Sequence, residues 1–358
     1  NSMSIRIVDA DAHVIETMET FNYLSEDEQK YRPVRLAPMD DDKILTQTGN
    51  QTKEYWLVDG SVWTGTRNQD YQRTTPGTRE MTDIEGRLRH MDEMGVDVQV
   101  LYPSFFLSGK TENPDWNWAL CRSYNRWMAD IWKKSNNRLR WVAIPPLHSM
   151  ETVREELAFC KENGACGVFL VGIEDGKMPD DPYFYPLWEA AQELDLAACF
   201  HSGIHSQTYM DVFKGASTRF MSNRSPGVGA FHALIMRDIP KKFPAMRWGF
   251  VEFSASWLPY AINYTELSYW KNSNQPEWDS TGILKNNNIY VACQVTDDLP
   301  YIIDKVGEDN LVIGTDYGHH DQATEIDAMQ KLRDEGTLSG QVVDKILDDN
   351  ARAFYGLD

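Results

Sequence analysis

The alternation of short β-branched runs with amphipathic segments is the feature that most restricts how this chain can fold. Eight runs read as strands, namely Ile5–Asp11, Val96–Tyr102, Arg140–Ile144, Gly167–Val171, Ala197–His201, Trp248–Glu252, Ile289–Cys293 and Leu311–Thr315. Helical patterns accompany them, namely Asp83–Met94, Trp116–Lys134, Met150–Asn163, Pro186–Leu194, Gly229–Arg237, Trp257–Trp270, Leu299–Val306 and Gln341–Phe354. Eight βα units in order predict an α/β fold of the (β/α)8 TIM-like barrel type, whose functional groups follow the strands. We expect residues 1–358 to form one such domain.

One segment interrupts this rhythm. The stretch between His13 and Thr82 is too long for a plain βα loop and is rich in turns. It contains three strand-like pieces, Lys43–Gln47, Lys53–Val58 and Ser61–Thr64. We therefore expect residues 17–80 to form an inserted β-hairpin cap, which either closes the barrel mouth as a lid or packs on the barrel side. As a lid it would supply three aromatic side chains, Tyr55, Trp56 and Trp63.

Composition excludes several classes of protein. The chain has 35 Lys and Arg against 54 Asp and Glu, a formal charge of −19, so nucleic acid is not expected as its main partner. It has no apolar run long enough to span a membrane, and its 42% hydrophobic content argues against disorder. The five cysteines are odd in number and widely spaced, which indicates reduced thiols and a cytoplasmic protein.

The first predicted strand ends in a cluster of polar side chains. In Asp9-Ala10-Asp11-Ala12-His13, the alternation of a strand puts Asp9, Asp11 and His13 on one face, directed into the barrel. Burying two carboxylates beside an imidazole is costly unless a cation shares them. We therefore favour metal ligands here over the alternative, in which Asp11 caps the following turn.

Three other predicted strands end in similar residues. The fifth ends in His201, the sixth in Glu252, and the eighth runs into Asp316, followed by His319 and His320. Together with His13 at the end of the first strand, they place four of the eight histidines in strand-end stretches. Because the carboxyl ends of barrel strands meet at one mouth, these side chains predict a common site.

These motifs together resemble the amidohydrolase superfamily. Asp-x-His ends strand one, His-Ser-Gly follows strand five, and Gly-Thr-Asp-Tyr follows strand eight. The resemblance spans Ile7 to Leu357 and is closest to the branch that contains aminocarboxymuconate semialdehyde decarboxylase and the resorcylate-type decarboxylases. It implies a divalent metal held by Asp11, His13 and His201, with Asp316 as a further ligand or general base.

The sequence also departs from that family pattern. Strand one carries Asp11 where many members have histidine, strand six ends in Glu252 where the decarboxylases usually have histidine, and strand four has no bridging lysine. The possible ligands are therefore Asp11, His13, Glu16, His201, Glu252, Asp316 and His320. Such an oxygen-rich set suits Mn, Fe or an expanded Zn site, with one or two ions.

Two functions are compatible with such a centre. In the first, a divalent metal assists cleavage of a C–C bond (decarboxylation) or a C–N or C–O bond in a small aromatic or cyclic substrate, while Asp316 moves a proton. In the second, two irons activate oxygen to hydroxylate a bulky apolar substrate. The resemblance favours the first, whereas Glu252 and the missing lysine favour the second. A metal-free binding barrel is disfavoured because crowded carboxylates would lack a counter-ion.

Several further residues are weaker candidates. His232 and His201 could act in catalysis, although a packed helix histidine looks the same as His232 in sequence. Possible substrate contacts are Tyr102, Phe106, Arg219 and Tyr317. Two helices carry aromatic faces that predict a homodimer interface, built from Trp116, Trp118, Trp127 and Trp132 and from Trp257, Tyr260, Tyr264 and Trp270.

Overall fold

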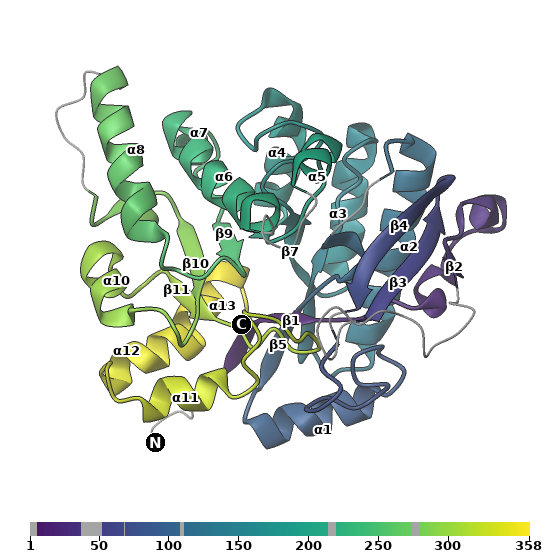
Figure 1. Cartoon of the computed structure of the whole chain (residues 1–358), viewed down its shortest axis with the longest axis horizontal. Coiled ribbons are helices and arrows are strands. Elements are labelled where there is room, and N and C mark those ends of the chain that lie inside the picture. The colour runs from purple at the N-terminus through teal and green to yellow at the C-terminus, as the bar shows by residue number, and fades with distance from the viewer. Residues whose placement is uncertain (1–5, 37–51, 68, 108–110, 214–219, 274–279) are drawn as a thin grey trace.

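Eight parallel strands form the central sheet of the protein. The computed structural model describes residues 6–36, 52–67, 69–107, 111–213, 220–273 and 280–358 (Figure 1). The strands are β1 (Val8–His13), β5 (Val98–Tyr102), β6 (Leu139–Ala143), β7 (Ala165–Leu170), β8 (Ala197–His201), β9 (Trp248–Val251), β10 (Ile289–Cys293) and β11 (Leu311–Ile313). They pair in chain order from β1 to β11, and most of their side chains are buried.

The sheet closes on itself where β1 meets the segment after β11. The Asp316 amide donates to the Asp11 carbonyl (2.8 Å) and the His13 amide to the Tyr317 carbonyl (2.9 Å). Gly314 makes this approach feasible, since a Cβ atom there would lie 2.3 Å from the Asp11 Cβ. This closure confirms the predicted (β/α)8 barrel.

Helices surround the barrel and connect successive strands. The main ones are α1 (Ile84–Met94), α2 (Pro114–Lys133), α3 (Val153–Glu162), α4 (Tyr185–Glu193), α6 (Ser225–Met236), α8 (Leu258–Ser273), α10 (Leu299–Val306) and α13 (Asn350–Tyr355). The others are α5 (Gln207–Val212), α7 (Ile239–Lys242), α9 (Ile283–Asn286), α11 (Ala328–Asp334) and α12 (Gly340–Asp344). The predicted single helix Gln341–Phe354 is instead divided into α12, a π-helix (Lys345–Asp349) and α13. Within the described ranges, no helix has the length and apolar character of a membrane span.

The segment after β1 contributes a small antiparallel sheet and two 3-10 helices. The sheet consists of β2 (Val34–Leu36), β3 (Thr52–Val58) and β4 (Ser61–Arg67), and the 3-10 helices are Met18–Phe21 and Glu26–Tyr31. The predicted piece Lys43–Gln47 lies outside the described residues.

Aromatic contacts attach this segment to the barrel in two places. Trp56 and Trp63 of the hairpin lie 5.3 and 5.2 Å from the Phe105 ring, in the loop after β5. Tyr31 lies 5.2 Å from Trp116 of α2, so part of the aromatic face of α2 is covered by the chain's own insertion. The insertion therefore reaches both the barrel side and the loops at the barrel mouth.

Candidate metal centre

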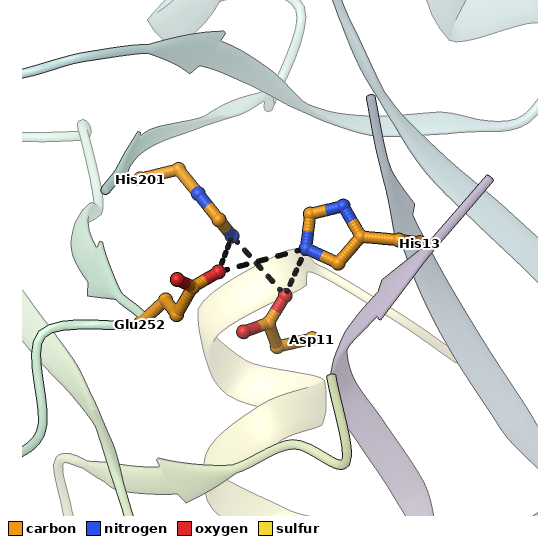
Figure 2. A group of neighbouring side chains, drawn as sticks. All are labelled: Asp11, His13, His201 and Glu252. Atoms are coloured by element: carbon orange, nitrogen blue, oxygen red, sulfur yellow. Dashed lines mark hydrogen bonds and ion pairs between the residues drawn. The ribbon is translucent and has the colours of Figure 1, made fainter. Parts of the chain in front are cut away.

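Four side chains from three strand ends converge inside the barrel mouth (Figure 2). Asp11 and His13 come from β1, His201 ends β8, and Glu252 directly follows β9. All four are buried. His201 Nε2 lies 3.1 Å from Glu252 Oε2 and 3.4 Å from Asp11 Oδ1, and His13 Nε2 lies 3.4 Å from the same Asp11 oxygen.

A second group overlaps the first. Asp316 Oδ1 lies 3.3 Å from His13 Nε2 and 2.9 Å from His319 Nδ1. The rings of His13 and His319 stack with their centroids 3.9 Å apart. Each group of four offers ligand atoms within 4.8 Å of one another, and the two groups share His13 and Glu252.

The hydrogen bonds of His13 and His201 fix which ring nitrogen faces the centre. His13 Nδ1 lies 3.0 Å from the Pro103 carbonyl oxygen, and His201 Nδ1 lies 2.8 Å from that of Ser202. A carbonyl oxygen can only accept a hydrogen bond, so each Nδ1 carries the hydrogen. When the rings are neutral, each Nε2 presents its lone pair to the carboxylates, which is the usual arrangement of a metal-binding histidine.

His319 is oriented in the same way through a serine. Ser104 Oγ donates to the Val14 carbonyl (2.7 Å), and it also lies 2.7 Å from His319 Nε2. Because the serine hydrogen is already used, the His319 Nε2–H group must donate to Ser104 Oγ. The neutral His319 ring therefore turns the lone pair of Nδ1 toward Asp316.

The carboxylates complement these imidazoles. Glu252 Oε1 accepts from Ser202 Oγ (2.7 Å) and Arg224 Nη1 (2.9 Å), and Asp316 Oδ2 accepts from Thr324 Oγ1 (2.7 Å). The other oxygens, Glu252 Oε2 and Asp316 Oδ1, are buried and find no hydrogen-bond donor among the described residues, and His13 Nε2 likewise finds no partner there. Lone pairs that face one another at about 3 Å repel unless a positive charge lies between them. The donor set thus fits a divalent cation.

Two of these carboxylates belong to residues whose own backbone is strained. Glu252 has φ of 64° and Asp316 has φ of 53°, both in the left-handed region that non-glycine residues rarely adopt. Such conformations cost roughly 1–3 kcal/mol each and tend to cluster at functional sites. Both residues stand directly after a strand or close to its end, where the turn redirects the side chain into the barrel mouth.

The electrostatics of the centre show the same need for positive charge. Burial alone would raise the pKa of Asp11, but His201 and His13 lower it to about 2. Burial would lower the pKa of His201, but Glu252 and Asp11 raise it well above its ordinary value. Burial, together with Asp321 and Glu252, raises the pKa of Asp316 well above the ordinary value. In the metal-free protein, protons on His13, His201 and Asp316 would offset the carboxylate charge.

The prediction that Asp9 shares the face of Asp11 and His13 is wrong. Asp9 pairs with Gln99 and His13 with Tyr102, so β1 holds one residue more than β5 between these pairs and forms a bulge. The Asp9 carboxylate accepts from Gln99 Nε2 (2.9 Å) and from Thr315 N (2.9 Å) and Oγ1 (2.6 Å). Burial raises its pKa to about 6. Asp9 therefore joins β1 to its neighbours.

The structure does not bring two of the predicted ligands to the centre. Both Glu16 oxygens accept from backbone amides, of Ser104 at 3.0 and 3.1 Å and of Phe105 at 2.8 Å. His320 is exposed, whereas its neighbour His319 joins Asp316. The sequence contained a signal for His319, because it lies in the same strand-end stretch as Asp316.

The predicted substrate contacts have different positions. Tyr102 is buried beneath the centre, with its ring 5.0 Å from that of His201 and its hydroxyl bonded to Tyr355 (2.7 Å). Tyr317 packs its ring against the guanidinium of Arg87 at 3.6 Å, and its hydroxyl bonds to residues outside the centre. Neither therefore reaches the cluster with its hydroxyl. Arg219 lies outside the described residues.

His232 is a contact between helices. It lies on α6, and its Nδ1 is 2.9 Å from Thr265 Oγ1 on α8. Its ring also lies 5.3 Å from that of Tyr264. The structure thus gives the predicted catalytic histidine a packing role instead.

An apolar pocket and a larger cleft lie beside the centre. Phe106 lines the pocket together with Phe169, whose ring is 6.4 Å from that of His201. The cleft, of about 770 Å³, is bordered by the tip of the β3–β4 hairpin and by the loops after β7 and β8. Trp63 and His205 line both cavities, so the two adjoin.

Comparisons with known proteins extend over most of the chain. A model of the family described as Amidohydrolase matches residues 8–357. The 2-amino-3-carboxymuconate-6-semialdehyde decarboxylase of Dictyostelium discoideum is 22% identical over 289 residues, which cover 77% of this chain and 77% of that protein.

Solved structures share the fold. An amidohydrolase from Mycobacterium avium subsp. paratuberculosis K-10 gives a TM-score of 0.80 at 16% identity, covering 99% of this chain and 100% of the other. A dihydroxybenzoic acid decarboxylase from Polaromonas sp. JS666, solved with manganese and the inhibitor 2-nitroresorcinol, gives 0.65 at 18% identity, covering 99% and 97%.

Proposed function

The chain belongs to the amidohydrolase family, and from this premise we propose that it is a metal-dependent enzyme that decarboxylates a small aromatic or cyclic acid. The observation that carries the metal-dependent part is the orientation of three buried imidazoles. His13, His201 and His319 each bind an oxygen through the outer ring nitrogen and direct the inner one at carboxylate oxygens.

The proposed ligands all lie in this cluster. They are Asp11, His13, His201, Glu252, Asp316 and His319. A divalent ion bound there would polarise a carboxylate or carbonyl oxygen of the substrate, or lower the pKa of a bound water to about 7. Manganese is the first choice, because the set is rich in oxygen and the related dihydroxybenzoic acid decarboxylase was solved with manganese. Zinc and iron are the alternatives.

Asp316 is the proposed proton carrier. Its Oδ2 is held by Thr324, and its Oδ1 faces the centre without a hydrogen-bond donor. Burial raises the pKa of this carboxyl in the metal-free protein, and a bound cation would lower it again, toward the range in which one group can both take up and give up a proton. In decarboxylation, a proton must replace the departing carbon dioxide on the substrate carbon, and Asp316 is positioned to hold that proton.

Substrate selection is assigned to the apolar pocket and the cap. Phe106 and Phe169 offer flat apolar surfaces near His201, which suit a ring. Ser61, Val62 and Trp63 of the hairpin border the adjoining cleft. We therefore propose that the insertion of residues 17–80 acts as a cap on the substrate side.

Decarboxylation is preferred over hydrolysis because of the relatives. The Dictyostelium discoideum protein and the Polaromonas protein are both named as decarboxylases. The testing experiment incubates the manganese-loaded protein with a panel of hydroxybenzoic and muconic acids and measures carbon dioxide release. Release of an amine or alcohol from amide and ester panels, without carbon dioxide, would overturn the proposal in favour of hydrolysis.

A second candidate function rests on the number of ligands. The two overlapping groups together supply three carboxylates and three imidazoles, and Glu252 and His13 belong to both. Two-iron centres that activate oxygen also combine carboxylates with histidines, with four carboxylates and two histidines in the helix-bundle type. The alternative is therefore a non-haem di-iron monooxygenase that hydroxylates a bulky apolar substrate. Metal analysis separates the two: two irons per chain with oxygen consumption supports this alternative, and one manganese supports decarboxylation.

A further inference from the structure

The turn that carries Glu252 is unusual in its backbone. β9 ends at Val251, and the next residues include two non-glycine positions in the left-handed region, Glu252 (φ 64°) and Ser254 (φ 60°). A turn with two such residues persists only when its surroundings hold it in place. Something outside the turn must therefore offset its strain.

Arg224 Nη1 donates to the Glu252 carbonyl, Trp257 Nε1 donates to that of Ser254, and a carboxylate from outside the turn holds the residues that follow Glu252. Asp297, in the loop between β10 and α10, accepts from the Ala255 amide (2.9 Å) and from the hydroxyls of Ser254 (2.7 Å) and Ser256. It also accepts from the amide of Gln294 (2.8 Å), directly after β10. A single side chain thus ties the Glu252 turn to β10. β10 is the strand that pairs with β9 in the barrel (Figure 1).

The bonds of Asp297 are divided between its two oxygens. Oδ2 receives the two backbone amides, and Oδ1 receives the two serine hydroxyls. Hydrogen bonds to an ionised carboxylate are stronger than neutral ones. Four such hydrogen bonds to the Asp297 carboxylate hold the turn rigidly against the loop after β10.

We propose that Asp297 is a positioning residue for the metal centre, which acts by holding the strained turn so that Glu252 Oε2 faces His201 and His13. The inference rests on the proposed metal centre. Asp297 does not belong to the ligand groups of the described residues, and its effect passes through the backbone of residues 252–256. Outer partners of metal ligands commonly change metal affinity by about 10- to 100-fold.

The test measures manganese(II) binding to metal-free protein by titration calorimetry, together with thermal unfolding of the same samples. Asp297→Ala, which loses all four bonds, should bind manganese about 10- to 100-fold more weakly than the wild type. Asp297→Asn should bind with intermediate affinity. Its oxygen can still accept the two backbone amides, and the serine hydroxyls can rotate to accept from its amide group.

Asp298→Ala is the matched control. Asp298 is the neighbouring carboxylate, and it caps α10 by accepting from the Tyr301 amide (3.2 Å). Among the described residues, those at positions 254–256 of the turn donate to the Asp297 side chain instead. This variant should lose stability but keep wild-type manganese affinity. Wild-type affinity in Asp297→Ala, or an equal loss in Asp298→Ala, would overturn the positioning role. If Asp297→Ala does not fold, wild-type affinity in Asp297→Asn overturns it. Failure of the wild type to bind manganese, zinc or iron would instead refute the metal centre itself.

Discussion

Glu16 is a buried carboxylate near the centre, and an experiment can decide whether it is held by backbone amides or binds the metal. Its oxygens accept only backbone amides, and burial raises its pKa from the ordinary 4.5 to about 7. The folded protein therefore binds this proton more tightly than the unfolded chain. The stabilisation is complete below pH 4.5 and is lost as the pH rises through about 7.

The size of the effect follows from the two pKa values. A change from 4.5 to about 7 corresponds to roughly 3 kcal/mol, since one pKa unit is about 1.4 kcal/mol. Glu16→Gln should remove this dependence. The Gln oxygen can take the position of Oε2, which accepts from both Ser104 and Phe105. Its NH2 group then replaces Oε1 at 3.0 Å from the Ser104 amide, and the cost of these two facing donors does not depend on pH. The free energy of unfolding of the variant, minus that of the wild type, should therefore increase by about 3 kcal/mol as the pH rises from 4.5 to 8.

The assay is urea unfolding of metal-free protein from pH 4.5 to 8, followed by tryptophan fluorescence. Glu19→Gln, which changes an exposed glutamate three residues further on, is the control and should follow the wild-type curve. Parallel curves for Glu16→Gln and the wild type would refute the reasoning. The manganese content of Glu16→Gln should equal that of the wild type, and loss of the metal would instead make Glu16 a ligand.

Three further predictions concern the centre and the surface. His319→Ala should lower manganese affinity by at least about 100-fold, beyond the effect of an outer partner, whereas His320→Ala should not change it, as measured by titration. Asp316→Asn should lower turnover by about 100-fold or more with an unchanged circular dichroism spectrum, and near-normal turnover would exclude it as proton carrier. Helix α8 exposes Tyr264 and Trp270, so sedimentation should give a dimer of the 41.2 kDa chain, and Trp270→Glu should dissociate it.

The sequence was most informative for short apolar runs that polar residues follow directly. Ala197–His201 and Ile289–Cys293 were predicted with the bounds that the structure has. The first strand was predicted as Ile5–Asp11 but is observed as Val8–His13. Its last residues bond to the segment after β11, about 300 residues away in the chain, and local pattern has no access to such a contact.

Part of the centre could be predicted from the sequence, because the ends of the strands in a barrel must converge at one mouth. His13, His201 and Glu252 were found from this rule alone, since each stands at the end of its strand or directly after it. Asp9 could not be excluded, because the bulge in β1 reverses the alternation and leaves no mark in the sequence pattern.

His319 shows why alternation fails beyond a strand. Extending the period of two from Asp316 selects His320, which lies four residues further on. Asp316 and Gly318 both have positive φ, and the His319 amide returns to the Asp316 carbonyl at 3.1 Å, so the chain turns there. In a turn, residues three apart meet, which brings His319 to Asp316. The strain that hides this proposed ligand from the sequence pattern also aims both side chains at the centre.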